Sequence, residues 1–267
     1  MKLTGIGGVA AAIGLLLAAG AATAAETPAI HLGTAVKIGQ GIARTMVVES
    51  KTGQPASIAV VLSEKALEGL PAGHAGSHEA HVTELPMPAK GPKTGYDHAT
   101  IDWNPNGHVP EGIYSAAHFD VHFYLIDRAS RDAITFKGEA AAEAAKEPPV
   151  DLVPAGFVVP PDGAVEKMGL HGVDPSGPEF KGKPFTATFI YGYHRGETVF
   201  MEPMVTKAFL ETKPDVTLAV RTPKAYSRPG WYPTRYRVAY DAGAKTYVVA
   251  MTGLRAWRMG EAPMAAR

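Results

Sequence analysis

Residues 42–63 read IARTMVVES-KTGQ-PASIAVVLS, in which two apolar, β-branched segments flank a short polar turn that contains Gly53. This arrangement predicts an antiparallel β-hairpin. The same pattern recurs twice later in the chain, at residues 185–202 and 235–251. Each of these segments also has a glycine in its turn, and no longer-range repeat is evident. Hairpins are therefore expected to form most of the fold.

Shorter segments add strands and helices to these hairpins. Further strands are expected at residues 99–103 and 118–126, and short helices at residues 64–70, 139–146 and 203–211. Ser63 is placed to cap the first helix, and Pro203 to open the last. Residues 71–96 are expected to be mostly connector, and the proline-rich residues 148–161 to be a linker or a wrapping arm. The prediction is an α+β, mainly β fold, in which antiparallel hairpins form a barrel- or sandwich-like sheet with a few short helices.

The N-terminus has the three parts of a secretory signal peptide. Lys2 is the only charged residue in a start that continues into the apolar residues 6–21 and ends in the small-x-small site Ala22-Thr23-Ala24. Cleavage is expected after Ala24, with Ala25 as the alternative. Residues 1–24 are thus assigned to the signal peptide.

The remaining residues 25–267 are expected to form a single mature domain. Glycines within the apolar stretch, and the lack of a basic cluster after it, argue against a retained membrane anchor. The chain has no cysteine and so no site for a bacterial lipid anchor. We therefore expect a free, soluble protein of the periplasm or the cell exterior.

The composition excludes several classes of function. The 26 Lys and Arg balance the 26 Asp and Glu, so there is no electrostatic reason to expect a nucleic-acid or anionic-membrane partner. The absence of cysteine rules out thiol catalysis, disulfides and thiolate metal sites. No P-loop, nucleophile elbow or dinucleotide-binding glycine motif is present, so no nucleotide cofactor is expected and the catalytic residues, if any, are unassigned.

The segment HFDVHFY at residues 118–124 carries the strongest chemical signal. Side chains alternate between the two faces of a strand, so His118, Asp120 and His122 share one face, and the phenylalanines and valine between them share the apolar core face. Imidazole and carboxylate groups on one face are suitable ligands for a divalent transition metal such as zinc, copper, iron or manganese.

Strand geometry limits how these side chains can act together. His118 and His122 lie roughly 13 Å apart at Cα in a regular strand, so both can reach one ion only if the strand bends or bulges. Asp120 then either pairs with one histidine as a ligand or orients it from behind. Two alternatives stay open: a solvated polar face without metal, and a His–Asp pair used for acid–base chemistry.

Further ligands must come from distant parts of the chain. Glu202 lies between methionines, so its carboxylate is expected to be partly buried and to need a partner, either an ion, an arginine or a helix N-terminus. His171 lies in a glycine-flanked loop and is the supporting candidate, with His108 in a similar loop as a weaker one. The predicted metal ligands are therefore His118, Asp120, His122, His171 and Glu202. Other histidines, at residues 74, 78, 81 and 194, are expected to be exposed.

Several motifs also resemble, in order, an uncharacterised bacterial domain family labelled sigma-E-regulated gene product-like. They are Asp102–Pro110, Gly112–Tyr114, His118–Tyr124, Met168–His171, Phe189–Gly192, Phe200–Met204 and Tyr232–Tyr236. The resemblance covers roughly residues 30–255, and departs from the family pattern at Gly172, where tryptophan is usual, and at the turn around His194. It implies a β-rich fold and a homo-oligomer, and it implies no reaction.

Two functions of different classes follow from these observations. The first is an exported metal-binding protein, in which the ion could serve as a Lewis acid or water activator. The second is a non-catalytic, oligomeric envelope or stress-associated protein without metal. The first function requires the His118, His122 and Glu202 side chains to converge within roughly 5 Å of a common point, and it fails with these ligands if they do not.

Overall fold

The computed structural model describes residues 28–74 and 76–259. The predicted signal peptide, residues 1–24, lies outside the described residues. Within the described part of the chain, no helix is both long enough and apolar enough to span a membrane.

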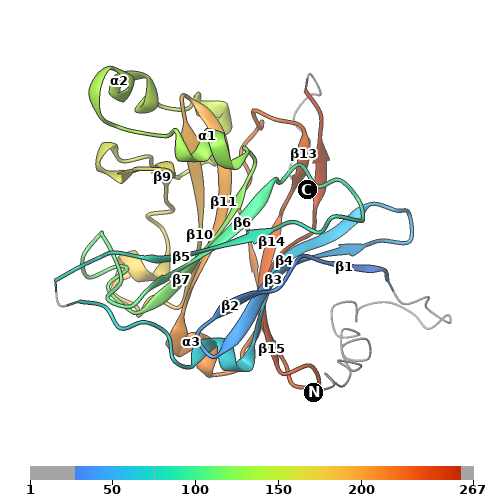
Figure 1. Ribbon diagram of the computed structural model, residues 1–267. Coiled ribbons are helices and arrows are strands. Elements are labelled where there is room, and N and C mark those ends of the chain that lie inside the picture. The colour runs from blue at the N-terminus through green and yellow to red at the C-terminus, as the bar shows by residue number, and fades with distance from the viewer. Residues whose placement is uncertain (1–27, 75, 260–267) are drawn as a thin grey trace.

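Two seven-stranded sheets make up most of the molecule (Figure 1). The strands of the first sheet are β1 (Ile30–Leu32), β2 (Val36–Ile38), β3 (Gly41–Glu49), β4 (Pro55–Ser63), β12 (Asp215–Ala219), β14 (Arg235–Asp241) and β15 (Thr246–Thr252). Their order is β1-β3-β4-β15-β14-β12, and β2 pairs with β3 beside β1.

The second sheet carries the polar segment 118–124. Its strands are β5 (His81–Pro86), β6 (His98–Asn104), β7 (His118–Tyr124), β8 (Ala164–Val165), β9 (Gly169–Gly172), β10 (Ala187–His194) and β11 (Glu197–Thr206). Their order is β5-β6-β7-β11-β10-β9-β8, and a third, two-stranded sheet pairs β13 (Gly230–Tyr232) with β16 (Arg255–Trp257).

Helices in the described residues are all short. The α-helices are α1 (Arg128–Asp132), α2 (Ala141–Ala144) and α3 (Lys207–Glu211), and the 3-10 turns are Glu64–Leu67, Gly138–Ala140, Val150–Leu152, Pro161–Gly163 and Pro178–Lys181. Strands paired in antiparallel fashion therefore dominate, which confirms the predicted fold class. The three predicted hairpins are also confirmed, as β3–β4, β10–β11 and β14–β15.

The main apolar core lies between the two large sheets. Phe119, Val121 and Phe123 of β7 are buried in one cluster with Val60 of β4 and Val249 of β15. This confirms the core face predicted for residues 118–124. Face-to-face packing of apolar side chains from both sheets is the arrangement of a β-sandwich.

The opposite face of the second sheet is also covered. The segment between β7 and β10 contributes β8 and β9 to the edge of this sheet beside β10, and its helices α1 and α2 lie on the side of the sheet away from the first sheet (Figure 1). Two smaller apolar clusters hold it there: Phe185 packs with Met204 of β11, and Ile134 packs with Phe200 of β11 and Tyr124 of β7. The polar face of β7 is therefore covered by other parts of the chain, and it is not exposed to solvent.

Residues 71–96, predicted to be mostly connector, contain the short strand β5. Two local predictions were wrong. Pro203 lies inside β11 opposite Phe189, and the helix after it begins only at Lys207, capped by the Thr206 side chain. Ser63 precedes a 3-10 turn without capping it, because its hydroxyl oxygen accepts a hydrogen bond from the backbone N–H of Ile42 instead.

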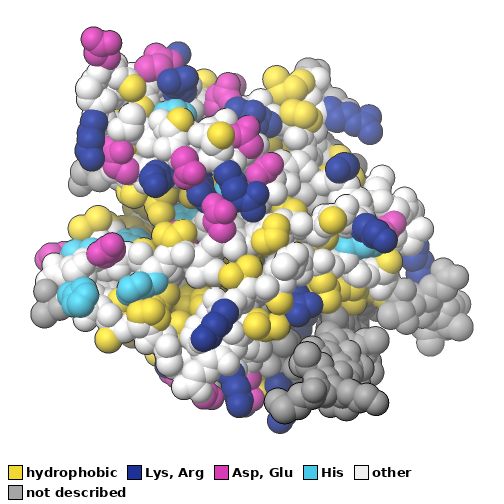
Figure 2. Space-filling model, viewed as in Figure 1, with side chains coloured by type: hydrophobic (Ala, Val, Ile, Leu, Met, Phe, Trp, Pro, Cys, Tyr) yellow, Lys and Arg dark blue, Asp and Glu magenta, His cyan; other side chains and the backbone are white. Residues whose placement is uncertain are grey.

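The surface agrees with the balanced composition. On the face seen in Figure 2, acidic and basic side chains are interspersed, most densely around α1. Part of this mixture is an ion-pair network in which Arg128 and Arg131 both contact Glu84 of β5. The pair of Arg128, whose side chain is 45% exposed, is of the kind that contributes little to stability.

Candidate metal centre

Polar side chains of three neighbouring strands meet on the enclosed face of the second sheet. The register of β6 and β7 places Thr100 opposite His122, Asp102 opposite Asp120, and Asn104 opposite His118. The register of β7 and β11 pairs Met201 with Phe123 and Met204 with Asp120, so Glu202 falls opposite His122. Alternation along each strand sends all these polar side chains to the same face.

The first of two groups of possible ligands is the Glu202 group, which consists of His122, His171 and Glu202. One ligand atom of each lies within 4.8 Å of the others. The His122 Nε2 is 3.5 Å from one Glu202 oxygen, and the His171 Nε2 is 3.9 Å from the other. His171 reaches this point from β9, whose residue His171 pairs with Gly192 of β10.

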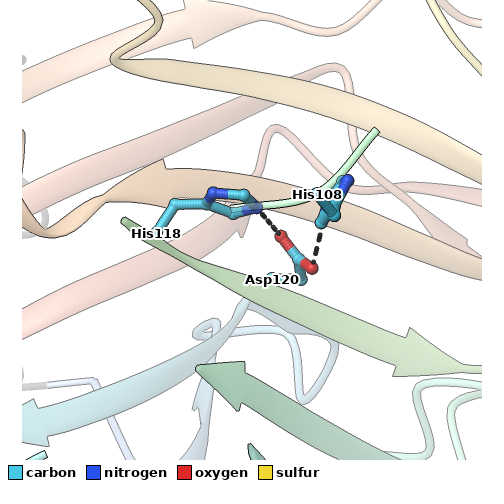
Figure 3. A group of neighbouring side chains, drawn as sticks. All are labelled: His108, His118 and Asp120. Carbon is cyan, nitrogen blue, oxygen red and sulfur yellow. Dashed lines mark ion pairs between the residues drawn. The ribbon is translucent and has the colours of Figure 1, made fainter. Parts of the chain in front are cut away.

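The second is the Asp120 group, which consists of His108, His118 and Asp120 and meets the same 4.8 Å limit. The two imidazoles flank the carboxylate, as Figure 3 shows. The Nε2 of His118 lies 3.1 Å from one Asp120 oxygen, and the Nε2 of His108 lies 3.3 Å from the other. Asn104 also donates a hydrogen bond of 2.7 Å to the oxygen that faces His108.

All four imidazoles are held by their Nδ1 atoms. His108, His118 and His171 place Nδ1 within 2.6–2.9 Å of the backbone carbonyls of Val109, Ala116 and Gly163. A carbonyl can only accept, so Nδ1 carries the proton in each of these rings and the neutral ring has its lone pair on Nε2. The Nδ1 of His122 faces Thr100 and Asp102 instead, each at 3.3 Å. This is how metal-ligating histidines are usually oriented by their outer neighbours.

Several atoms at the centre of this arrangement are buried without a hydrogen-bond partner. They are the Nε2 atoms of His118 and His122, one oxygen each of Asp120 and Glu202, and both oxygens of Asp102. Buried polar groups in native proteins nearly always have a partner, and buried charges are paired or bound to a metal. The unpartnered atoms of the two groups thus mark the places where a cation would fit, whereas Asp102 belongs to neither group.

Burial controls the charge of the Glu202 group. It lowers the pKa of His122 to about 3, so this imidazole is neutral at pH 7. Burial, together with the charges of Asp120 and Asp102, raises the pKa of Glu202 well above its ordinary value. Burial and the Asp120 charge likewise raise the pKa of Asp102 to about 8. A nearby cation would reverse the effect on both carboxyl groups.

In the Asp120 group the pKa of the carboxyl group is lowered, in contrast to that of Glu202. Burial by itself would raise the pKa of Asp120, but the charges of His118 and His108 and their close contacts with its oxygens outweigh it and lower that pKa. Burial tends to lower the pKa of His108, and its contact with the Asp120 carboxylate reverses this and raises it. The Asp120 group is therefore built around an ionised carboxylate.

The structure brings the five predicted ligands into one enclosed region but divides them between the two groups. Glu202, His122 and His171 come together, whereas His118 and Asp120 join His108, the weaker loop candidate. The predicted convergence of His118, His122 and Glu202 on one point is therefore wrong, because His118 lies too far from His122 along the strand to reach the same ion. His171 takes the place of His118 beside His122 and Glu202. The partner of Glu202 is a pair of imidazoles, and no helix begins at Pro203.

Asp102 and Asn104 are site residues that the sequence reasoning did not find. Both lie on β6 beside the two groups. Thr100, Asp102 and Asn104 alternate with apolar residues in the same way as residues 118–124. That alternation was the signal that could have located them.

The other histidines lie apart from both groups. His81 belongs to β5, and His78 contacts the Gly107 carbonyl at 2.9 Å through Nδ1. His194 was expected to be an exposed turn residue, but it is partly buried at the end of β10. It lines a cavity of about 1040 Å³, bordered by residues 87–97, and none of the described residues that line this cavity belongs to either group.

The aromatic ring of Phe200 supports the Glu202 group. Its centroid is 4.8 Å from that of His122 and 5.3 Å from that of His171. The ring occupies the space left open by Gly192 on β10, where an added Cβ would overlap it. Close packing of this kind tolerates no extra methyl group without movement.

We expect Gly192→Ala to destabilise the fold by about 1–3 kcal/mol, because Phe200 must shift to admit the methyl group. Urea unfolding measures this loss. Gly163→Ala is the control, since an added Cβ there finds its nearest neighbour at 3.4 Å, in ordinary contact. Equal stability of the two variants would show that Phe200 does not fill the space above Gly192.

The comparison with protein families matches only part of the chain. Residues 50–103 are similar to the family described as "TTHB210-like: Hypothetical protein TTHB210". This agrees with the resemblance to an uncharacterised family over β4 to β6, a shorter range than the expected residues 30–255, and it says nothing of sigma-E regulation. No curated protein and no solved structure matches the chain. The matched range includes Asp102 and ends before the two groups of possible ligands.

Proposed function

We propose that the protein is an exported metal-binding protein, which holds a divalent transition-metal ion between His122, His171 and Glu202. One observation carries the proposal: the buried Nε2 of His122 and one buried oxygen of Glu202 lack hydrogen-bond partners and lie beside the Nε2 of His171. Export is supported by the N-terminal sequence pattern, and assembly into a homo-oligomer by the family resemblance alone.

The separations of the ligand atoms support an ion more than direct hydrogen bonds. The contacts of 3.5 and 3.9 Å between imidazole nitrogen and carboxylate oxygen exceed the usual range for a hydrogen bond. Nitrogen and oxygen ligands about 2.1 Å from a tetrahedral zinc ion lie roughly 3.4 Å from each other. A small movement of the three side chains toward one another would therefore bring their ligand atoms to the spacing found around such an ion.

Ligand chemistry narrows the choice of metal. Two imidazoles and one carboxylate suit zinc, copper, iron or manganese, and the set contains no thiolate. Three protein ligands leave a coordination position for water or a substrate, as in hydrolytic zinc sites. The side chain of His171 is 15% exposed, whereas those of His122 and Glu202 are almost fully enclosed, so any outer ligand would approach from the His171 side.

We expect the protein, purified without a histidine tag from the periplasmic fraction, to contain stoichiometric transition metal by elemental analysis. Glu202→Gln is expected to lose the ion of the Glu202 group, because an amide is a much poorer ligand than a carboxylate. The intact mass of the same sample shows whether the chain begins after Ala24 or Ala25.

His31→Gln is the matched control. His31 is a partly buried imidazole on the other sheet, 2.6 Å from Glu49, and it belongs to neither group. It should keep the full metal content. A wild-type protein that binds none of the four metals, even after they are added in excess, would contradict the proposal and favour a non-catalytic protein without metal.

A further inference from the structure

We infer that the Asp120 group is a second site for a divalent transition metal, so that the enclosed face of the second sheet carries a two-metal centre. The inference rests on the proposed function, because it extends the metal centre from the Glu202 group to His108, His118 and Asp120. Nothing in the family resemblance assigns a ligand to these residues.

The first argument is the common design of the two groups. Each has two imidazoles and one carboxylate, and in each the three ligand atoms lie within 4.8 Å of one another. No residue belongs to both. His118 and His122 lie four residues apart on β7, roughly 13 Å between Cα atoms, so a single ion cannot use both without distorting the strand. Two ions satisfy all four imidazoles where one cannot.

The second argument is the anchoring of the ligands. The Nδ1 atoms of His108 and His118 face the carbonyls of Val109 and Ala116, each at 2.6 Å, so both rings turn Nε2 toward Asp120. Asn104 holds one oxygen of Asp120 by a hydrogen bond of 2.7 Å. The geometry in Figure 3 thus presents two nitrogens and a fixed carboxylate to one small volume.

The third argument is the state of the inner atoms. The Nε2 of His118 and the nearer Asp120 oxygen form an ion pair at 3.1 Å, and both atoms are buried without a hydrogen-bond partner. A cation lying beside both atoms would satisfy the two at once.

Solvent reaches the Asp120 group from one side. The side chain of His108 is 26% exposed, whereas that of His118 is fully buried. The loop that carries His108 therefore forms the solvent side of the Asp120 group. Metal would enter past His108, and the coordination position left open by three protein ligands would face the same way.

Isothermal titration of EDTA-treated protein with Zn²⁺ tests the inference, and elemental analysis of the dialysed product provides an independent count. The wild-type protein and the His31→Gln control are expected to bind two ions per chain. His118→Gln should bind one ion, held by the Glu202 group, and Glu202→Gln should bind one, held by the Asp120 group. The double variant should bind none.

The outcomes separate the inference from the proposed function. A single ion in the wild type that persists in His118→Gln and disappears in Glu202→Gln overturns the second site and leaves the first. A single ion lost only in His118→Gln overturns the assignment to the Glu202 group. No ion in the wild type overturns both. The number of ions bound by the wild-type protein tests the inference even if a variant fails to fold. Near-ultraviolet circular dichroism shows whether each variant keeps its packed core.

Discussion

Zinc at a thousandfold excess over its dissociation constant is expected to raise the thermal midpoint of the EDTA-treated protein by about 8–16 °C for each site that it fills. Binding to the folded state alone at that excess stabilises it by about 4 kcal/mol for one site, and each kcal/mol shifts the midpoint of a chain of this size by about 2–4 °C. Differential scanning calorimetry with and without Zn²⁺ measures the shift.

Variants show which group of ligands produces the shift in the thermal midpoint. Glu202→Gln should lose the part that comes from the Glu202 group, whereas His31→Gln should show the full wild-type shift, since its imidazole lies outside both groups. The Glu202→Gln protein without metal is expected to be at least as stable as the wild type, because the neutral amide removes a buried carboxyl group with an unpartnered oxygen. Equal shifts in Glu202→Gln and the wild type would place the stabilising ion elsewhere.

Local pattern was sufficient to predict the hairpins. The turns at Gly53, Gly196 and Gly243 each adjoin two apolar segments, and neighbouring strands joined by such turns pair with each other. Period-two alternation in residues 118–124 was likewise sufficient to separate the core face from the ligand face. Both signals depend on a few consecutive residues, so no distant contact was needed to read them.

Pairing between distant strands could not be read in this way. The two groups exist because β7 lies between β6 and β11, and β11 is about eighty residues away in sequence (Figure 1). Pro203 shows the same limit. Its local preference is for a helix start, but pairing of β11 with Phe189 of β10 determines its conformation, and the β7 ladder is interrupted where the proline lacks an N–H.

Burial of the ligand face, apart from the predicted partial burial of Glu202, was the other feature that the sequence did not reveal. A polar strand face in a hairpin protein is ordinarily solvated. Here an irregular segment with little apolar periodicity covers it, held by contacts such as Phe185 with Met204. That covering changes the chemistry, since it turns Asp102, Asp120 and Glu202 from surface carboxylates into buried ones.

Asp102→Asn is expected to stabilise the metal-free protein, by an amount that grows with pH. Burial and the Asp120 charge raise the pKa of Asp102 to about 8 in the folded state, against an ordinary value of 3.8. Between these values the folded protein holds a proton that the unfolded chain has released. Stability of the wild type therefore falls as pH rises through this window, by about 1.4 kcal/mol per pH unit for this one group.

The asparagine side chain does not titrate. The difference in unfolding free energy between the variant and the wild type therefore reports the titration of Asp102 alone, because the other buried groups are common to both proteins. We expect the difference to increase by about 4 kcal/mol between pH 5 and pH 8, as measured by urea unfolding in EDTA. With metal bound the advantage should shrink by about 1.4–2.7 kcal/mol, because Asp102 contacts the His122 Nδ1 at 3.3 Å and loss of such a contact weakens metal binding by about 10- to 100-fold. A pH-independent difference in EDTA would show that Asp102 is ionised in the metal-free fold, and that some other group supplies the charge that compensates it.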